Sequence, residues 1–357
     1  MRVRRVHEKA KRKSTSRVAF TWRTRTRMEN EAAARAAAGA SRGGENFVVD
    51  AHVHVWLMQD EESASSQSAS PQFVAFAAGK EPEVAASPAL LLKQMDEAGI
   101  DGALIVQPIN YGFDHTFVTR TIAAQPDRFA GCLLANPHDE DASELRNLAA
   151  TGHYHAVRFN PYLFDAAAGG MACPAGRTLY KACGELGLAV GVMAFHGIEP
   201  LVPQIEALCE CSPSTLMMLD HFGFCGRGDT PASPSPDPVW ADWEIVVELA
   251  RRFEQIYVKL SAFDRQPRFL TPDDTSDKYL GIRELIGDAI SQIGSDRLIY
   301  GTDFPFVNDA GNIGYVEAKQ LVERACKEAG LTAEAKDLVI GGNLRRILPR
   351  AFQPQDQ

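Results

Sequence analysis

Residues 47–56 read Phe47-Val48-Val49-Asp50-Ala51-His52-Val53-His54-Val55-Trp56. This apolar, β-branched run predicts a buried strand. Side chains two residues apart in a strand project to the same side, so His52 and His54 form a pair on one face. Two imidazoles placed in this way suit a metal ion, although a lone His-x-His pair also arises by chance. The rest of the chain decides between these two interpretations.

Helical and strand-like segments alternate after this first strand. Helices are predicted at 88–98, 114–125, 143–150, 177–186, 200–211, 239–253, 279–293 and after residue 314, and strands at 102–107, 129–135, 155–159, 188–194, 216–220, 256–260 and 298–300. Such alternation favours right-handed βαβ units around a parallel sheet. About eight units fit an α/β fold of the (β/α)8 TIM barrel type, and the open doubly wound sheet is the competing arrangement.

The composition divides the chain into three parts: a basic, Ala-rich extension (1–45), the barrel (46–350) and a short tail (351–357). Up to residue 27 the extension holds eleven Lys or Arg residues and a single acid, Glu8. This composition is typical of an organellar transit peptide, which would place the protein in a chloroplast or mitochondrion. The alternatives are a disordered basic tail, or a true start at Met28 and a cytoplasmic protein.

The remaining composition excludes several classes of protein. The net charge is −9 although the extension is basic, so the body of the chain is acidic and does not suit nucleic acid. No apolar run reaches the roughly 18 residues of a membrane span. The seven cysteines are scattered, which predicts reduced thiols rather than a disulfide framework or a zinc ribbon. A homo-oligomer is compatible with these features, but the sequence does not define one.

Polar residues gather where the predicted strands end. They are His52 and His54 on the first strand, Arg158 and Asn160 after the fourth, His196 after the fifth, Asp220 and His221 after the sixth, and Asp303 after the eighth. In barrels of this type the reactive groups lie at the C-terminal ends of the strands, because the following loops converge there. The positions therefore predict a site at that end.

Seven short motifs lie at these strands and in the closing segment. They are Val49-Asp50-Ala51-His52-Val53-His54-Val55-Trp56, Leu104-Ile105-Val106-Gln107-Pro108, Ala156-Val157-Arg158-Phe159, Met218-Leu219-Asp220-His221-Phe222-Gly223, Val258-Lys259-Leu260-Ser261, Tyr300-Gly301-Thr302-Asp303-Phe304-Pro305 and Gly342-Asn343-Leu344-Arg345-Arg346-Ile347-Leu348. Together, and in this order, they resemble the amidohydrolase superfamily, and within it the amidohydrolase-2 group of TIM-barrel metal-dependent hydrolases and decarboxylases.

The resemblance implies a mononuclear metal site. In metal-bearing members, two first-strand histidines, a fifth-strand histidine and an eighth-strand aspartate hold one divalent ion, usually zinc, with manganese as the alternative. In this chain the ligands would be His52, His54, His196 and Asp303. Arg158 stands where binuclear relatives carry a carbamylated lysine, so the resemblance implies at most one ion. Some relatives work without metal, and metal-free activity remains an alternative.

Asp303 and His221 are the predicted catalytic residues. A bound metal lowers the pKa of its water toward neutrality. Asp303 would accept the water's proton, while the ion and His221 polarise a substrate carbonyl. For Asp303 the alternative is a helix cap before Pro305.

Four residues are predicted to bind the substrate. The guanidinium of Arg158 suits a carboxylate bidentately, and the alternative is a structural ion pair in the barrel mouth. Asn160 and Tyr162 extend the same wall, and Arg227 lies in a loop that could close over the substrate. Lys259 lies within a strand and is assigned to the barrel interior rather than to the chemistry.

The resemblance makes a small-molecule carboxylate the expected partner. The leading hypothesis is a hydrolase that cleaves a C–O bond in a small carboxylated lactone or cyclic ester. The first alternative is a non-oxidative decarboxylase of an aromatic or muconate-type acid on the same fold. The second is a barrel that binds a metabolite without catalysis.

Overall fold

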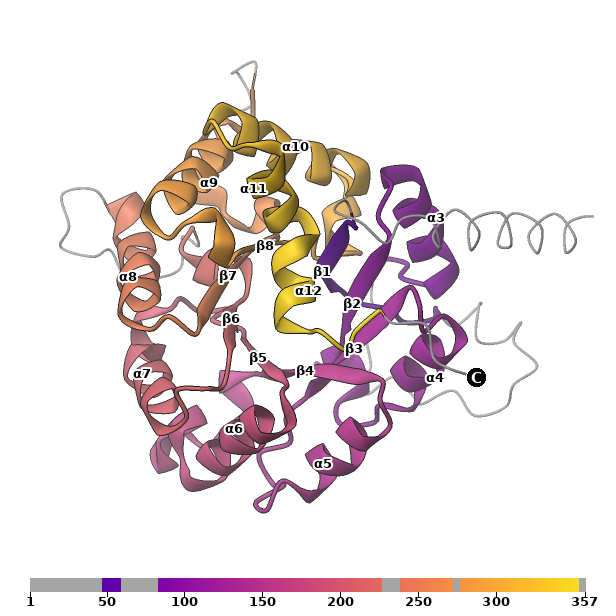
Figure 1. Ribbon diagram of the computed structural model, residues 1–357, viewed down its shortest axis with the longest axis vertical. Coiled ribbons are helices and arrows are strands. Elements are labelled where there is room, and N and C mark those ends of the chain that lie inside the picture. Colours follow the sequence, from indigo (N-terminus) through magenta and orange to yellow (C-terminus); the bar gives the residue numbers. More distant parts are fainter. Residues whose placement is uncertain (1–46, 59–82, 227–237, 272–276, 353–357) are drawn as a thin grey trace, which may run out of the picture. The chain divides into compact units, whose positions relative to one another are not determined.

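The predicted strands all pair in parallel, each with its neighbour in the sequence (Figure 1). The computed structural model describes residues 47–58, 83–226, 238–271 and 277–352. The strands are β1 (Val49–Val53), β2 (Gly102–Val106), β3 (Phe129–Leu134), β4 (Tyr154–Phe159), β5 (Ala189–Val192), β6 (Met217–Leu219), β7 (Ile256–Leu260) and β8 (Leu298–Tyr300). The strand order β1 to β8, without a reversal, excludes the doubly wound alternative and confirms the TIM barrel.

The first and last strands of the sheet, β1 and β8, are joined near their C-terminal ends. The amide of Asp303 donates to the carbonyl of His52 at 2.9 Å, and the amide of His54 donates to the carbonyl of Phe304 at 2.8 Å. Asp50 ties the same two segments together, because its carboxylate accepts from the hydroxyl of Thr302 at 2.6 Å and from the amide of Thr302 at 2.9 Å. This seam fixes the position of the first strand against the loop that carries Asp303.

Helices surround the sheet and cover its outer face (Figure 1). They are α3 (Pro88–Ala98), α4 (Thr116–Ala124), α5 (Ser143–Ala150), α6 (Pro174–Leu186), α7 (Val202–Cys211), α8 (Pro238–Arg252), α9 (Leu280–Gln292), α10 (Tyr315–Glu328), α11 (Ala333–Asp337) and α12 (Asn343–Ile347). The last of these packs Leu344 and Ile347 against the apolar side chains inside the barrel, such as Leu104 and Ile299, and closes one of its ends.

The interior of the barrel changes from apolar to charged along the strands. Ala156, Met218 and Tyr257 belong to the apolar interior cluster. Because side chains alternate in a strand, the residues two positions further on also face inward. Those residues are Arg158, Asp220 and Lys259, and all three are buried. The alternation of side chains along the strands therefore places charged residues inside the barrel at its C-terminal end.

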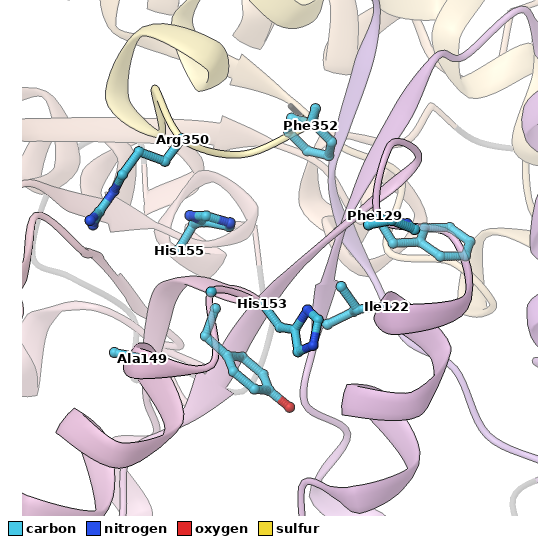
Figure 2. A pocket seen from close by; sticks show the side chains of 10 residues that line it. Ile122, Phe129, Ala149, His153, His155, Arg350 and Phe352 are labelled. Carbon is cyan, nitrogen blue, oxygen red and sulfur yellow. The ribbon is translucent and has the colours of Figure 1, made fainter. Parts of the chain in front are cut away.

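A cavity of about 210 Å³, here called the second cavity, lies at the N-terminal ends of β3 and β4, opposite the charged end of the barrel. Its walls include Phe129, His153, His155, Arg350 and Phe352 (Figure 2). Nη2 of Arg350 donates to the carbonyl of Leu186 at 2.6 Å, beyond the wall of the cavity.

Some predictions fall on residues outside the described ranges. The transit-peptide interpretation of residues 1–45 and the substrate role of Arg227 are among them, and both stay predictions, as do the domain boundaries. Within the described residues, no helix has the length and apolar character needed to cross a membrane.

Candidate active site

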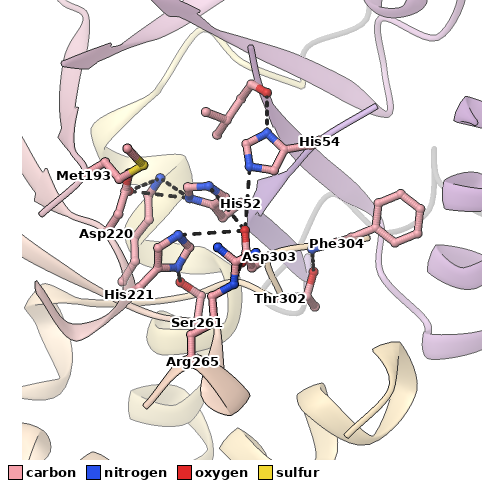
Figure 3. Close-up of polar contacts among 12 residues, drawn as sticks. His52, His54, Met193, Asp220, His221, Ser261, Arg265, Thr302, Asp303 and Phe304 are labelled. Carbon is pink, nitrogen blue, oxygen red and sulfur yellow. Dashed lines mark hydrogen bonds and ion pairs between the residues drawn. The ribbon is translucent and has the colours of Figure 1, made fainter. Parts of the chain in front are cut away.

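The site is built from β1 and from the loops that follow β6 and β8 (Figure 3). His52, His221 and Asp303 each offer a ligand atom there, and these three atoms lie within 4.8 Å of one another. All three side chains are almost completely buried. Residues from three separate strands therefore meet at one point, at the end of the barrel where the sequence placed the site.

Three histidines direct Nε2 toward the same carboxylate oxygen. The distance to Oδ1 of Asp303 is 3.8 Å from His52, 3.6 Å from His54 and 3.8 Å from His221. These distances are longer than a hydrogen bond. Because zinc binds nitrogen and oxygen ligands at about 2 Å, two ligands of one ion lie no more than about 4 Å apart. The spacing around Asp303 thus suits a metal ion, or a water molecule or substrate oxygen that takes its place.

In two of these histidines, Nδ1 forms a hydrogen bond on the side of the ring that faces away from Asp303. Nδ1 of His54 lies 2.8 Å from the carbonyl of Val106, which can only accept, so Nδ1 carries a proton and Nε2 has the lone pair whenever the ring is neutral. Nδ1 of His221 lies 2.8 Å from the hydroxyl of Ser261. A hydroxyl can donate or accept, so His221 can present Nε2 either as a donor or as a lone pair.

Three ion pairs balance the charges of two buried carboxylates. Nε of Arg265 lies 3.4 Å from Oδ2 of Asp303. Nζ of Lys259 lies 3.0 Å from Oδ1 of Asp220, and Nε of Arg158 lies 3.8 Å from its Oδ2. Each carboxylate has a cationic partner, as buried charges require.

These surroundings set the protonation states. Burial lowers the pKa of His221 to about 4 and that of His52 well below its usual range. Burial would raise the pKa of Asp303, but the charge of Arg265, with smaller contributions from the histidines, holds it below its ordinary value. Neutral imidazoles and an ionised carboxylate are the forms that bind metals and that accept protons.

The side chains also fit a divalent ion by what they leave unsatisfied. Nε2 of His52 and Oδ2 of Asp303 are buried, and neither has a hydrogen-bond partner among the described residues. Unpaired buried polar atoms are costly unless a ligand or an ordered water meets them. An ion beside Asp303 would satisfy the first of these atoms directly.

Two site residues have unusual backbone conformations. The φ angles of His221 and Asp303 are 56° and 69°, in the left-handed region that residues with side chains seldom adopt. Such conformations cost free energy and cluster at functional sites. Here they turn the side chains that follow β6 and β8 back over the end of the barrel.

A cavity of about 310 Å³, here called the site cavity, opens beside Asp303. Beyond His54 and Asp303, its walls include five predicted residues, together with Arg265, which was not predicted. The five are Arg158, Asn160, Tyr162, His196 and His221. Trp56, Phe224 and Phe306 provide apolar wall. A small molecule with both an anionic group and an apolar face fits this lining.

His196 lies apart from the three side chains that could share an ion. Its side chain is exposed, and its backbone amide donates to the hydroxyl of Tyr162 at 2.7 Å. Within the described residues the third member of the group is His221 instead. The proposed ligand role of His196 stays a prediction, and its place in the wall of the site cavity suits contact with a substrate.

Sequence reasoning missed several residues of the site. Asp220 and Lys259 form the ion pair behind His52, Ser261 supports His221, and Arg265 pairs with Asp303. The position of Lys259 in the barrel interior was predicted, but its contact with the site was not. Asp220 was predicted among the polar residues at the strand ends, and only its role behind His52 was missed.

Comparisons with known proteins show the family of this chain. The family model described as amidohydrolase matches residues 49–350. A 4-sulfomuconolactone hydrolase of Rhizobium radiobacter is 26% identical over 235 residues, which cover 64% of this chain and 68% of that protein.

Two solved structures share the fold. A probable 2-pyrone-4,6-dicarboxylic acid hydrolase from Acinetobacter baumannii, with citric acid bound, is 20% identical with a TM-score of 0.64, over 85% of this chain and 99% of that one. An amidohydrolase from Burkholderia multivorans with bound zinc is 19% identical with a TM-score of 0.62, over 85% and 99% of the two chains. With the match of the family model over most of its length, the chain belongs to the amidohydrolase family of hydrolases.

Proposed function

We propose that the protein hydrolyses a small carboxylated lactone or related cyclic ester. The observation that carries the proposal is the convergence of three imidazoles on one buried carboxylate, at the wall of a cavity that also contains Arg158 and Arg265. The similarity to a 4-sulfomuconolactone hydrolase supports this class of substrate.

Arg158 and Arg265 would hold the carboxylate of the substrate. Both line the site cavity, and a guanidinium matches a carboxylate with two parallel hydrogen bonds. Each is also paired with a carboxylate of the protein, so each is held in place before substrate arrives. Asn160 and Tyr162 would contact the rest of the molecule.

Asp303 would act as the general base. Its carboxylate remains ionised and borders the cavity, so it can take a proton from a water molecule as the oxygen of that water bonds to the lactone carbonyl carbon. In the metal-free site, Nε2 of His221 would donate to the carbonyl oxygen and stabilise its developing negative charge, whereas in the metal-bound site the same atom would be a ligand. The ring C–O bond then breaks, and the leaving oxygen takes up the proton held by Asp303. The products are a carboxylic acid, which releases its proton to the solvent, and a hydroxyl group on one open chain.

A divalent ion is part of the proposal. His52, His221 and Asp303 would hold it, with His54 at 3.6 Å from the same carboxylate oxygen. When bound, it would act as a Lewis acid and lower the pKa of water. Zinc is the first choice, because nitrogen and carboxylate ligands suit it and a zinc-bound structure shares the fold.

A substrate screen tests the proposal. Purified protein, with and without added zinc or manganese, is offered carboxylated lactones and, in parallel, benzoate-type and muconate-type acids. We expect ring opening, followed as acid release at constant pH. Release of CO₂ without ring opening would instead establish the decarboxylase alternative. Failure of both reactions in metal-replete protein would leave the metabolite-binding barrel.

A further inference from the structure

The histidine most deeply placed in the site faces two groups with opposite demands. Nδ1 of His52 lies 3.4 Å from Nζ of Lys259 and 3.5 Å from Oδ1 of Asp220. An ammonium can only donate a hydrogen bond, and a carboxylate can only accept one. A neutral imidazole has a single proton, so the partner that Nδ1 takes decides whether Nε2 carries a proton or a lone pair.

The geometry favours Lys259. Its contact with Nδ1, at 3.4 Å, has the geometry of a hydrogen bond, whereas Oδ1 of Asp220 lies slightly further from Nδ1, at 3.5 Å. Asp220 lies 3.0 Å from the ammonium and balances its charge. Lys259 is 1% exposed, so its ammonium is shielded from bulk water.

We propose that Lys259 is a positioning residue that keeps the proton of His52 on Nε2 and thereby weakens the binding of a divalent ion. The inference deepens the proposed function, since it rests on the ion site beside Asp303. With its proton on Nε2, His52 presents a donor toward the cavity side of Asp303, 3.8 Å from Oδ1. Such a donor serves a water molecule or a substrate oxygen, but it cannot ligate a metal.

An ion can bind His52 only after the proton has moved to Nδ1. Asp220 then becomes the acceptor behind the ring, in the arrangement of carboxylate, histidine and metal that is common in metalloproteins. Lys259 opposes this change in two ways, by claiming Nδ1 and by placing a positive charge next to the ring that would bind a cation. Lys259 and Asp220 therefore act in opposite directions on metal affinity.

Zinc affinity, measured by competition with a chromophoric chelator, tests this opposition without any substrate. We expect Lys259→Met to bind zinc at least about tenfold more tightly than the parent, and Asp220→Asn to bind it at least about tenfold more weakly, the range that outer partners of metal ligands usually control. Lys319→Met is the matched control, because Lys319 forms an ion pair with Glu323 on α10, one of the helices that cover the outer face of the sheet (Figure 1). Equal or weaker zinc binding by Lys259→Met would overturn the proposal.

The tautomer of His52 can be measured in the unaltered protein. Two-bond nitrogen–proton NMR spectra of selectively ¹⁵N-histidine-labelled, metal-free protein show which ring nitrogen carries the proton, and His52→Gln identifies the signals. We expect the proton on Nε2 for His52 and on Nδ1 for His54. A proton on Nδ1 of His52 would overturn the proposal even if Lys259→Met does not fold.

The two proposals fail in different ways. If no lactone is opened but zinc affinity rises in Lys259→Met, the substrate class is wrong and the role of Lys259 stands. If lactones are opened but the zinc affinity of Lys259→Met is unchanged, the role of Lys259 is wrong and the hydrolase stands.

Discussion

The two cavities of this barrel, of about 310 and 210 Å³, differ in what their polar groups face. In the site cavity, three Nε2 atoms point at Oδ1 of Asp303 without a hydrogen bond. In the second cavity, Arg350 donates to the carbonyl of Leu186, and the hydroxyl of Tyr154 bonds Thr119 at 2.8 Å. There only Nδ1 of His153 is buried without a partner among the described residues. In the site cavity, polar atoms are fixed in position but do not hydrogen-bond one another. This property distinguishes a reactive site from a cavity left by imperfect packing.

The largest expected effect separates the cavities by activity. Asp303→Asn should lower kcat/KM for ring opening by about 10³-fold, because an amide has a similar size but cannot accept a proton from water. Arg350→Ala, in the second cavity, should leave kcat/KM within about twofold of the parent. Initial rates at saturating metal measure both, and circular dichroism confirms folding. A loss of less than tenfold in Asp303→Asn would remove this residue from the role of base.

A pair of histidines sharpens the comparison, because each cavity contains one whose pKa is lowered to about 4 by burial. His221→Gln should lower kcat/KM by about 10²-fold, since a developing negative charge loses its stabilising donor or its metal. His155→Gln should change it by less than about twofold. Equal losses in the two variants would mean that activity depends on the lowered pKa that the two histidines share. The position of His221 beside Asp303 would then not explain its effect.

Most of the fold could be predicted from the sequence, because short apolar runs and amphipathic segments alternate without interruption. The same period of two that buries Ala156 and Tyr257 in the interior cluster places Arg158 and Lys259 on the inner side of their strands. The convergence of strand ends then followed from the barrel itself, and it brought His52, His54, His221 and Asp303 together.

The sequence could not settle contacts that depend on loop conformation. Beyond the end of a strand, the period of two no longer fixes the direction of a side chain. His221 turns inward because its φ is 56°, whereas His196, predicted as a ligand, is exposed. Arg265 belongs to a short helical turn after β7, and its pairing with Asp303 had no signal in any motif.

The smallest expected effect is on stability, and both cavities contribute to it. The pKa of His221 is about 4 in the folded protein and 6.5 in an unperturbed histidine. Between these values the unfolded chain binds a proton that the folded chain does not, so the free energy of unfolding decreases as the pH falls through this window. The share of His221 is about 2 kcal/mol between pH 7 and pH 5. His155 acts in the same direction with a smaller share, because it is partly exposed.

Urea unfolding of metal-free protein at pH 7 and pH 5 measures these shares by comparing variants with the parent. His221→Gln should reduce the loss of stability over this interval by about 2 kcal/mol, and His155→Gln by less. Burial raises the pKa of Asp50 to about 6, so its contribution is lost as the pH rises and has the opposite sign. That contribution is common to the parent and both variants and therefore cancels. An unchanged pH dependence in His221→Gln would show that His221 is not buried as a neutral ring, and the contrast between the cavities would lose its electrostatic basis.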